Sequence, residues 1–175
     1  MRKINSIIAL IITFLLFDHL VFGSLYLFGI GQGIIRPLAY GLVILIIIHA
    51  IISIVLSVRS MKNSYKTKTF YFKENHEYYL RRISGLAIIV FACLHVYGMG
   101  RDGNGPPRVA FMGTFGKLST SFLLISVLLH LYFNVKAILI ALGIRHSERL
   151  EKIIKAILLL LCAFALAANI YRLSH

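Results

Sequence analysis

The sequence has 175 residues, of which 59% are hydrophobic, and its mean hydropathy is +0.85. A soluble domain of this size could not bury so much apolar surface, whereas a lipid-solvated bundle has no need to, so we interpret residues 1–175 as a single membrane domain. Lys and Arg number 19 against 6 Asp and Glu, but they lie between apolar runs, which follows the pattern of membrane orientation and disfavours nucleic-acid binding.

Five apolar stretches are each long enough to cross a hydrocarbon core, which needs about 20 residues. The predicted helices cover residues 5–29, 37–58, 83–100, 118–142 and 153–172. The first has the basic start of a signal peptide, but its run is too long, no small-x-small cleavage site ends it, and it contains Asp18 and His19. We therefore expect an all-α transmembrane bundle of five helices.

The connections between these helices carry turn and interface signals. Glycines at 29, 31 and 33, followed by Pro37, predict a tight turn. Residues 101–107 contain two glycines and two prolines and open a longer loop that cannot be helical. Residues 60–79 are basic and rich in Tyr and Phe, which fits either an interfacial strap among anionic headgroups or a docking surface for a soluble partner.

Basic residues in the connections predict the orientation. The opposite side holds Arg36, Arg101, Arg108, Lys117 and Arg172, five in all, whereas thirteen flank the N-terminal side. Those thirteen are Arg2, Lys3, Arg59, Lys62, Lys66, Lys68, Lys73, Arg81, Arg82, Arg145, Arg149, Lys152 and Lys155. Because cytoplasmic loops carry the excess of Lys and Arg, the N-terminus is predicted in the cytoplasm and the C-terminus outside.

Four of the 7 histidines lie inside predicted helices, one in each of the first four: His19, His49, His95 and His130. Ionisable side chains within a membrane are rare and usually functional. A single one could simply hydrogen-bond a neighbouring helix. One in each of four consecutive helices instead indicates a shared ligand, and the fifth helix, which has none, would lie outside that bundle.

Haem is the ligand that this pattern favours. Neutral imidazole binds iron well, and facing helices of a bundle can supply it from opposite sides. Two histidines per iron leave no open position, which suits electron transfer, so the four predict two bis-histidine haems. Zinc or copper would need all four at one depth, within about 2 Å of the ion, whereas His95 lies six positions before Arg101. Cys93 and Cys162 form no C-x-x-C pattern, so zinc sites and thioether-bound haem are not indicated.

The surroundings of the histidines supply further candidates. Small residues that would leave room for a macrocycle, and that also mark ordinary helix contacts, lie three or four positions away: Gly23, Ser53, Gly98, Ser126 and Asn134. Haem propionates need cationic partners. The candidates are Arg81, Arg82 and Lys136, with Arg36, Arg101 and Arg108 on the outer side. Lys136 could equally extend to the interface. Asp18 is off the face of His19 and could orient another ligand, take up a quinone-linked proton or be structural.

The sequence resembles a known family over nearly its whole length. The segments that carry the likeness are Leu80–Gly85 (LRRISG), Phe91–Val96 (FACLHV), Ile48–Ala50, Leu129–His130, His19–Val21 and the connection with Arg145, His146 and Arg149. They resemble the five-helix dihaem cytochrome b subunit of succinate dehydrogenases and fumarate reductases. The four-histidine distribution is the most specific part of this resemblance.

The resemblance implies ligand pairs, partners and a location. His49 and His130 would hold the inner haem b, and His19 and His95 the outer one. A flavoprotein would interconvert succinate and fumarate, an iron–sulfur subunit would dock on the basic inner face, and the haems would connect it to menaquinone or another quinone in the bacterial inner membrane. The membrane subunit itself would hold no catalytic residue for succinate.

Two departures and two alternatives accompany this resemblance. The chain is short for the family, and residues 31–40 contain no acid where some fumarate reductases carry a glutamate tied to quinol oxidation. One alternative is the dihaem cytochrome b subunit of a membrane-bound hydrogenase or formate dehydrogenase, whose bundles commonly have four helices. The other is a non-redox transporter or scaffold with structural histidines, which predicts a colourless protein.

Overall fold

The computed structural model describes residues 1–28, 30, 36–66, 76–98, 100–101, 107–108, 114–144 and 147–174. Its helices are α1 (Arg2–Leu27), α2 (Arg36–Lys66), α3 (His76–Gly98), α4 (Thr114–Ala141) and α5 (Glu148–Ser174). Two short strands, β1 (Gly100–Arg101) and β2 (Pro107–Arg108), pair antiparallel between α3 and α4. All five helices are long and apolar enough to cross a membrane. The prediction of an all-α, multi-pass membrane protein is confirmed.

Several helix ends differ from the predicted ones. The prediction ended the second helix at residue 58 and began the third at 83, but α2 continues to Lys66 and α3 begins at His76. The apolar run measures only the part of a helix that lies in hydrocarbon, whereas residues 59–66 contain no Gly or Pro to stop the helix in water. The segment expected over 60–79 is therefore helical at both its ends, and residues 67–75 lie outside the described residues.

The remaining ends shift by a few residues, with α1 ending at Leu27, α4 beginning at Thr114 and α5 at Glu148. The expected turn around Gly29–Gly33 and the centre of the 101–107 loop lie outside the described residues. The edges of that loop are not helical, as predicted, but Gly100, which the prediction placed at the end of the third helix, pairs with Arg108, and Arg101 pairs with Pro107.

The connection from α4 to α5 shows how the sequence ends one helix and begins the next. Gly143 adopts a positive φ of 71°, which glycine tolerates without a Cβ clash. Its N–H and that of Ile144 bond the carbonyls of Ile140 and Leu139, both at 3.0 Å, as in a Schellman motif. The hydroxyl of Ser147 then accepts the N–H of Leu150 at 3.5 Å, in the position of an N-cap for α5.

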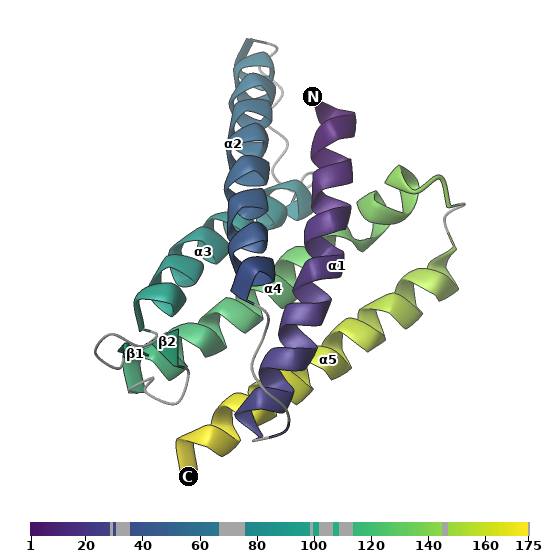
Figure 1. The fold of residues 1–175 in the computed structure, drawn as a ribbon. Coiled ribbons are helices and arrows are strands. Elements are labelled where there is room, and N and C mark those ends of the chain that lie inside the picture. Colours follow the sequence, from purple (N-terminus) through teal and green to yellow (C-terminus); the bar gives the residue numbers. More distant parts are fainter. Residues whose placement is uncertain are drawn as a thin grey trace.

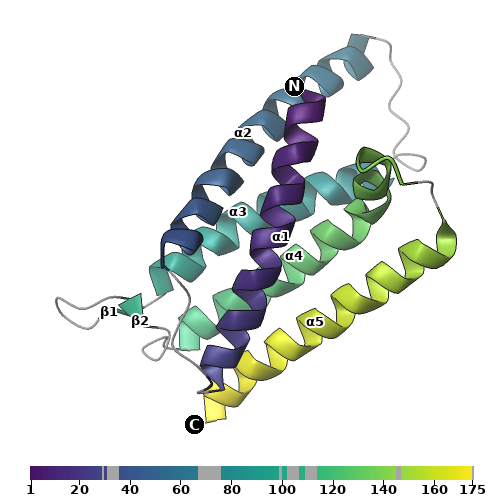
Figure 2. The same cartoon turned by 45° about the vertical axis from the view of Figure 1, so that its right-hand side comes forward.

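The helices lie in two crossed layers (Figure 1). In that view α1 and α2 run side by side and nearly vertical, while α3, α4 and α5 run obliquely behind them, with α4 between α3 and α5. The view turned by 45° shows the same order (Figure 2). The two termini lie at opposite ends of the molecule. The end of α2 and the beginnings of α3 and α5 lie toward the end where α1 begins.

Most of the buried apolar side chains lie on α4 and α5. The α5 face toward α4 carries small buried residues, among them Cys162, Ala165 and Ala168, which is the composition that allows close helix contact in membranes. Asn169, also on this face, is 3% exposed, and its amide donates to the carbonyl of Lys117 at 3.0 Å and the hydroxyl of Ser121 at 2.9 Å. Because Asn169 is buried, these bonds fix this end of α5 against α4.

Candidate functional site

The four intramembrane histidines form two couples in the structure. The rings of His95 and His19 lie within electrostatic range of each other, and so do those of His130 and His49. Each couple joins one helix of the first layer (α1 or α2) to one of the second (α3 or α4). All four residues are partly buried. We call His49 with His130 the inner couple and His19 with His95 the outer couple.

Polar contacts toward the beginning of α1 define a reference level for the depth of each histidine. The amide of Asn5 on α1 donates to the hydroxyl of Ser53 on α2 at 3.2 Å. A guanidinium nitrogen of Arg82 on α3 donates to the carbonyl of the same Ser53 at 3.3 Å. These three residues therefore lie at one level. His49 is one helical turn away from Ser53, roughly 6 Å along α2 at 1.5 Å per residue.

His130 lies at nearly the same level as His49. Its ring faces Ser84 and Gly85 on α3, with the hydroxyl of Ser84 3.2 Å from Nδ1. Gly85 is so close that an added Cβ would stand 3.2 Å from the ring carbon Cε1. Gly85 follows Arg82 by three residues, or roughly 4.5 Å of helix. Packing has thus brought the two members of the inner couple to one depth.

The outer couple is displaced from the inner couple along the helices. His19 follows Asn5 by fourteen residues and His95 follows Arg82 by thirteen. At 1.5 Å per residue these separations are roughly 21 Å along α1 and 20 Å along α3, so the two couples are separated by roughly 15 Å along the helices. No group of three or more His, Cys, Asp or Glu side chains that could hold a metal ion occurs among the described residues. The four histidines therefore offer ligands in twos, at two depths.

The ring nitrogens differ in their hydrogen bonds. Nδ1 of His95 lies 2.8 Å from the hydroxyl of Thr120 on α4, and Nδ1 of His130 contacts Ser84 as described. Nδ1 of His19 and Nδ1 of His49 are buried and have no hydrogen-bond partner among the described residues. Nε2 of His49 approaches the Ser53 hydroxyl at 3.5 Å, a long contact. A buried imidazole nitrogen without a partner is unfavourable in a membrane unless something else binds it.

Two of the cations expected to hold a propionate lie beside the inner couple. Both Arg81 and Arg82 interact electrostatically with His130. The guanidinium of Arg81 donates to the carbonyl of Phe133 at 3.3 Å. That of Arg82 lies 4.8 Å from the centre of the Tyr78 ring, and its Nε is buried without a hydrogen-bond partner among the described residues.

The other proposed contacts are not assembled in the same way. Lys136 is exposed. The side chains of Arg36, Arg101 and Arg108 lie outside the part of the chain that the structure describes. Asp18 is partly buried next to His19. Of the small residues expected near the ligands, Ser53 contacts His49, whereas the amide of Asn134 donates to the main-chain carbonyl of His130 at 2.6 Å.

Three contacts with the histidines were not predicted from the sequence: those of Ser84 and Gly85, which belong to the LRRISG segment, and that of Thr120. A usable signal exists for the first of them. Ser84 precedes His95 by eleven residues, about three helical turns, so both side chains occupy one face of α3, the face toward α4. Thr120 precedes His130 by ten residues on the opposing face of α4. The two contacts are therefore reciprocal, since each helix offers one hydroxyl and one histidine to the other.

No protein-family model matches the chain, and comparison with curated proteins and with solved structures gives no match either.

Proposed function

We propose that this chain is the membrane anchor and electron-transfer subunit of a succinate dehydrogenase or fumarate reductase in a bacterial cytoplasmic membrane. In this proposal it binds two b haems and passes electrons between a cytoplasmic iron–sulfur subunit and menaquinone or another quinone. The observation that carries the proposal is the arrangement of four intramembrane histidines as two couples at two depths.

The arrangement fits haem better than a bare metal ion. Porphyrin occupies four positions of the iron, so the protein supplies only two axial ligands, and facing helices can provide them. Each couple offers two imidazoles from opposed helices, and the buried Nδ1 atoms of His19 and His49 have no hydrogen-bond partner in the part of the chain that the structure describes. Gly85, without a Cβ, lets the His130 ring approach α3 closely. When bound, each haem would accept and release one electron.

The residues of the chain then have distinct tasks. His49 and His130 would hold the inner haem, and His19 and His95 the outer one. Arg82, whose Nε lies near the inner couple and has no hydrogen-bond partner among the residues that the structure describes, is the best-placed candidate for an inner propionate, and Arg81 is the second. A guanidinium suits a carboxylate because it can donate two parallel hydrogen bonds. The separation of roughly 15 Å along the helices would distribute the electron path across the bilayer.

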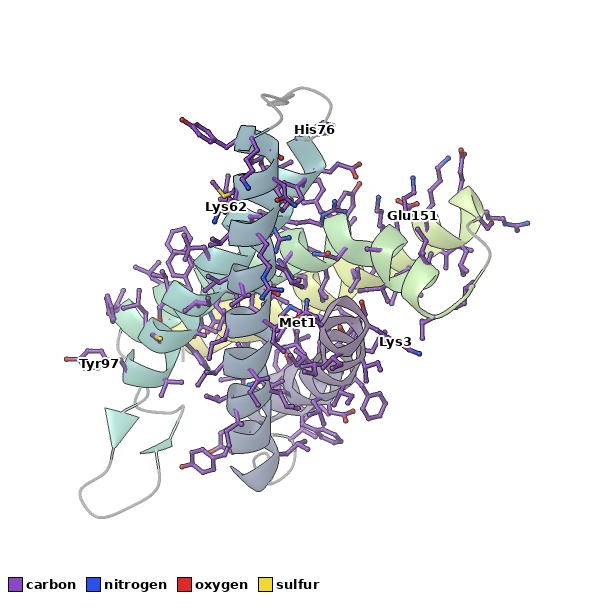
Figure 3. All side chains as sticks on the ribbon, turned by 90° about the horizontal axis from the view of Figure 1, so that it is seen from above. Met1, Lys3, Lys62, His76, Tyr97 and Glu151 are labelled. Carbon is purple, nitrogen blue, oxygen red and sulfur yellow. The ribbon has the colours of Figure 1, made fainter. Side chains whose placement is uncertain are left out.

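The end at which α1 begins supports the expectation of a soluble partner (Figure 3). Lys3 and Lys62 are displayed there around Met1, with His76 and Glu151 further out. The last turns of α2 carry exposed Arg59, Lys62 and Lys66 together with Tyr65, which is 76% exposed. Because α2 remains helical and extends beyond the start of α1 (Figure 2), it favours the docking surface over the interfacial strap.

The test is electron delivery in the complex. The chain should be expressed with its neighbouring genes, purified in detergent and examined by visible spectroscopy after addition of succinate. We expect reduction of b-type haem by succinate, and its reoxidation by a menaquinone analogue. The control is the His49→Ala variant, in which succinate should reduce one haem fewer.

The alternative outcomes separate the competing functions. Reduction of the haems by hydrogen or formate, but not by succinate, would indicate the hydrogenase or formate dehydrogenase type. A protein that stays colourless after expression with haem supplied and with its partner subunits would overturn the cytochrome proposal. It would leave a transporter or scaffold, in which the histidines hydrogen-bond between helices.

A further inference from the structure

The hydrogen bonds of two hydroxyl groups determine how two of the four histidines are held. A hydroxyl has one proton to donate and lone pairs that accept. The Thr120 hydroxyl is 2.8 Å from the carbonyl of Gly116 on its own helix and 2.8 Å from Nδ1 of His95. A carbonyl oxygen can only accept, so the hydroxyl proton belongs to that bond. Nδ1 of His95 must then carry the proton that the Thr120 oxygen accepts.

The same reasoning applies to His130. The Ser84 hydroxyl donates to the carbonyl of Arg81 at 3.2 Å and lies 3.2 Å from Nδ1 of His130. With its own proton directed to the carbonyl, Ser84 accepts Nδ1–H of His130. In both rings Nε2 is consequently the nitrogen with a free lone pair, which is the form that a metal ligand requires.

We propose that Ser84 and Thr120 are positioning residues that select the Nδ1–H tautomer of His130 and His95 and so present Nε2 as the ligand atom. This proposal rests on the proposed function, in which these histidines ligate haem. A hydrogen bond accepted from Nδ1–H also makes the imidazole a stronger donor of electrons to the metal. Each hydroxyl therefore lowers the reduction potential of one haem, Ser84 that of the inner and Thr120 that of the outer.

An asymmetry within each couple follows from this assignment. The histidines held by a hydroxyl both belong to the α3–α4 pair, whereas His19 and His49, on α1 and α2, have buried Nδ1 atoms without a hydrogen-bond partner among the described residues. The α3–α4 pair thus presents two oriented ligands, and α1 and α2 supply two whose rings are not fixed through Nδ1. Loss of a hydroxyl should affect the haem whose held ligand it contacts and leave the other haem unchanged.

The experiment is a redox titration of the purified complex, followed by visible spectra and by EPR of the ferric haems. We expect Ser84→Ala to raise the potential of the inner haem alone and Thr120→Val that of the outer haem alone. A tenfold change in the ratio of reduced to oxidised haem at fixed potential corresponds to about 59 mV for a one-electron couple. Roughly this shift is expected, with two haems still bound in each variant.

The controls separate the hydrogen bond from a general loss of packing. Ser119 is buried and donates to the same Gly116 carbonyl at 2.8 Å, and it makes no hydrogen bond to a histidine of the described residues, so Ser119→Ala should leave both potentials unchanged. Thr120→Ser and Ser84→Thr keep the hydroxyl and should restore values close to those of the unaltered complex. If Thr120→Val does not accumulate, Thr120→Ala and the independent Ser84→Ala variant carry the test.

The outcomes distinguish this inference from the proposed function. Two haems whose potentials in Ser84→Ala and Thr120→Val equal those in Ser119→Ala would overturn the inference and leave the function standing. A shift of both haems by either variant, or of the wrong haem, would overturn it as well. Failure of the unaltered complex to bind haem would overturn both.

Discussion

Replacing Gly85 by Ala tests how tightly α3 packs against His130. The added Cβ would stand 3.2 Å from Cε1 and 3.4 Å from Nδ1 of the ring. Ordinary carbon contacts lie at about 3.5–4.0 Å, so the ring or the helix must move by roughly 0.3 Å or more. Overpacking of this kind costs about 1–3 kcal/mol. The helix-propensity gain of Ala over Gly, about 0.5–1 kcal/mol, offsets part of that cost. We expect a net destabilisation of about 0–2.5 kcal/mol.

Gly41 provides the matched control, because it is also a helical glycine and a Cβ added there meets nothing within 4 Å. Gly41→Ala should stabilise the protein by about 0.5–1 kcal/mol. The free energy of unfolding of both variants should be measured in the same detergent from loss of helical circular dichroism. The inner haem spectrum should change only in Gly85→Ala. If Gly85→Ala stabilises the protein as much as Gly41→Ala, the packing described for His130 is wrong.

Three further changes test other parts of the account. Asn169→Leu removes two buried hydrogen bonds and should lower the free energy of unfolding by about 1–2 kcal/mol, whereas Ile170→Leu, at an exposed position, should leave it unchanged. Equal stability of the two variants would refute the role of these hydrogen bonds in holding α5 against α4. Arg82→Gln removes a positive charge beside the inner couple and should lower the reduction potential of the inner haem in a redox titration, while Arg82→Lys should leave that potential unchanged. A change confined to the reduction potential of the outer haem would contradict the placement of the couples. In a background without the native cysteines, Met61→Cys should react with a membrane-impermeant maleimide only in inside-out vesicles, and Tyr97→Cys only in right-side-out vesicles. The reverse labelling pattern would refute the predicted orientation.

The sequence was informative where the chemistry of single residues decides the outcome. Five apolar runs predict five membrane helices because the bilayer sets their length. A histidine in such a run stands out because so few polar residues are tolerated there. These features need no knowledge of how the helices pack, so both the fold class and the candidate ligands could be read before the structure was known.

The structure was needed where neighbouring helices decide the outcome. Ser84 and Thr120 resemble any small polar residue in a membrane helix until packing places them against His130 and His95. The end of α2 at Lys66 was missed for a different reason, since a helix that continues into water loses its apolar signal but not its backbone hydrogen bonds. The spacing of the histidines along the sequence could not predict their pairing, because pairing depends on which helices face one another. Before the structure, only the family resemblance implied the pairs.

The most direct test of the central claim is the number of haems held by paired histidine variants. The purified protein, expressed with its partner subunits, should give reduced-minus-oxidised spectra with b-type bands and a pyridine haemochrome count of two haems per chain. His49→Ala/His130→Ala removes both ligands of one proposed haem and should retain the other. His49→Ala/His95→Ala takes one ligand from each couple and should lose both. Equal retention in the two double variants would contradict the pairing, and a colourless unaltered protein would contradict the claim that the couples bind haem.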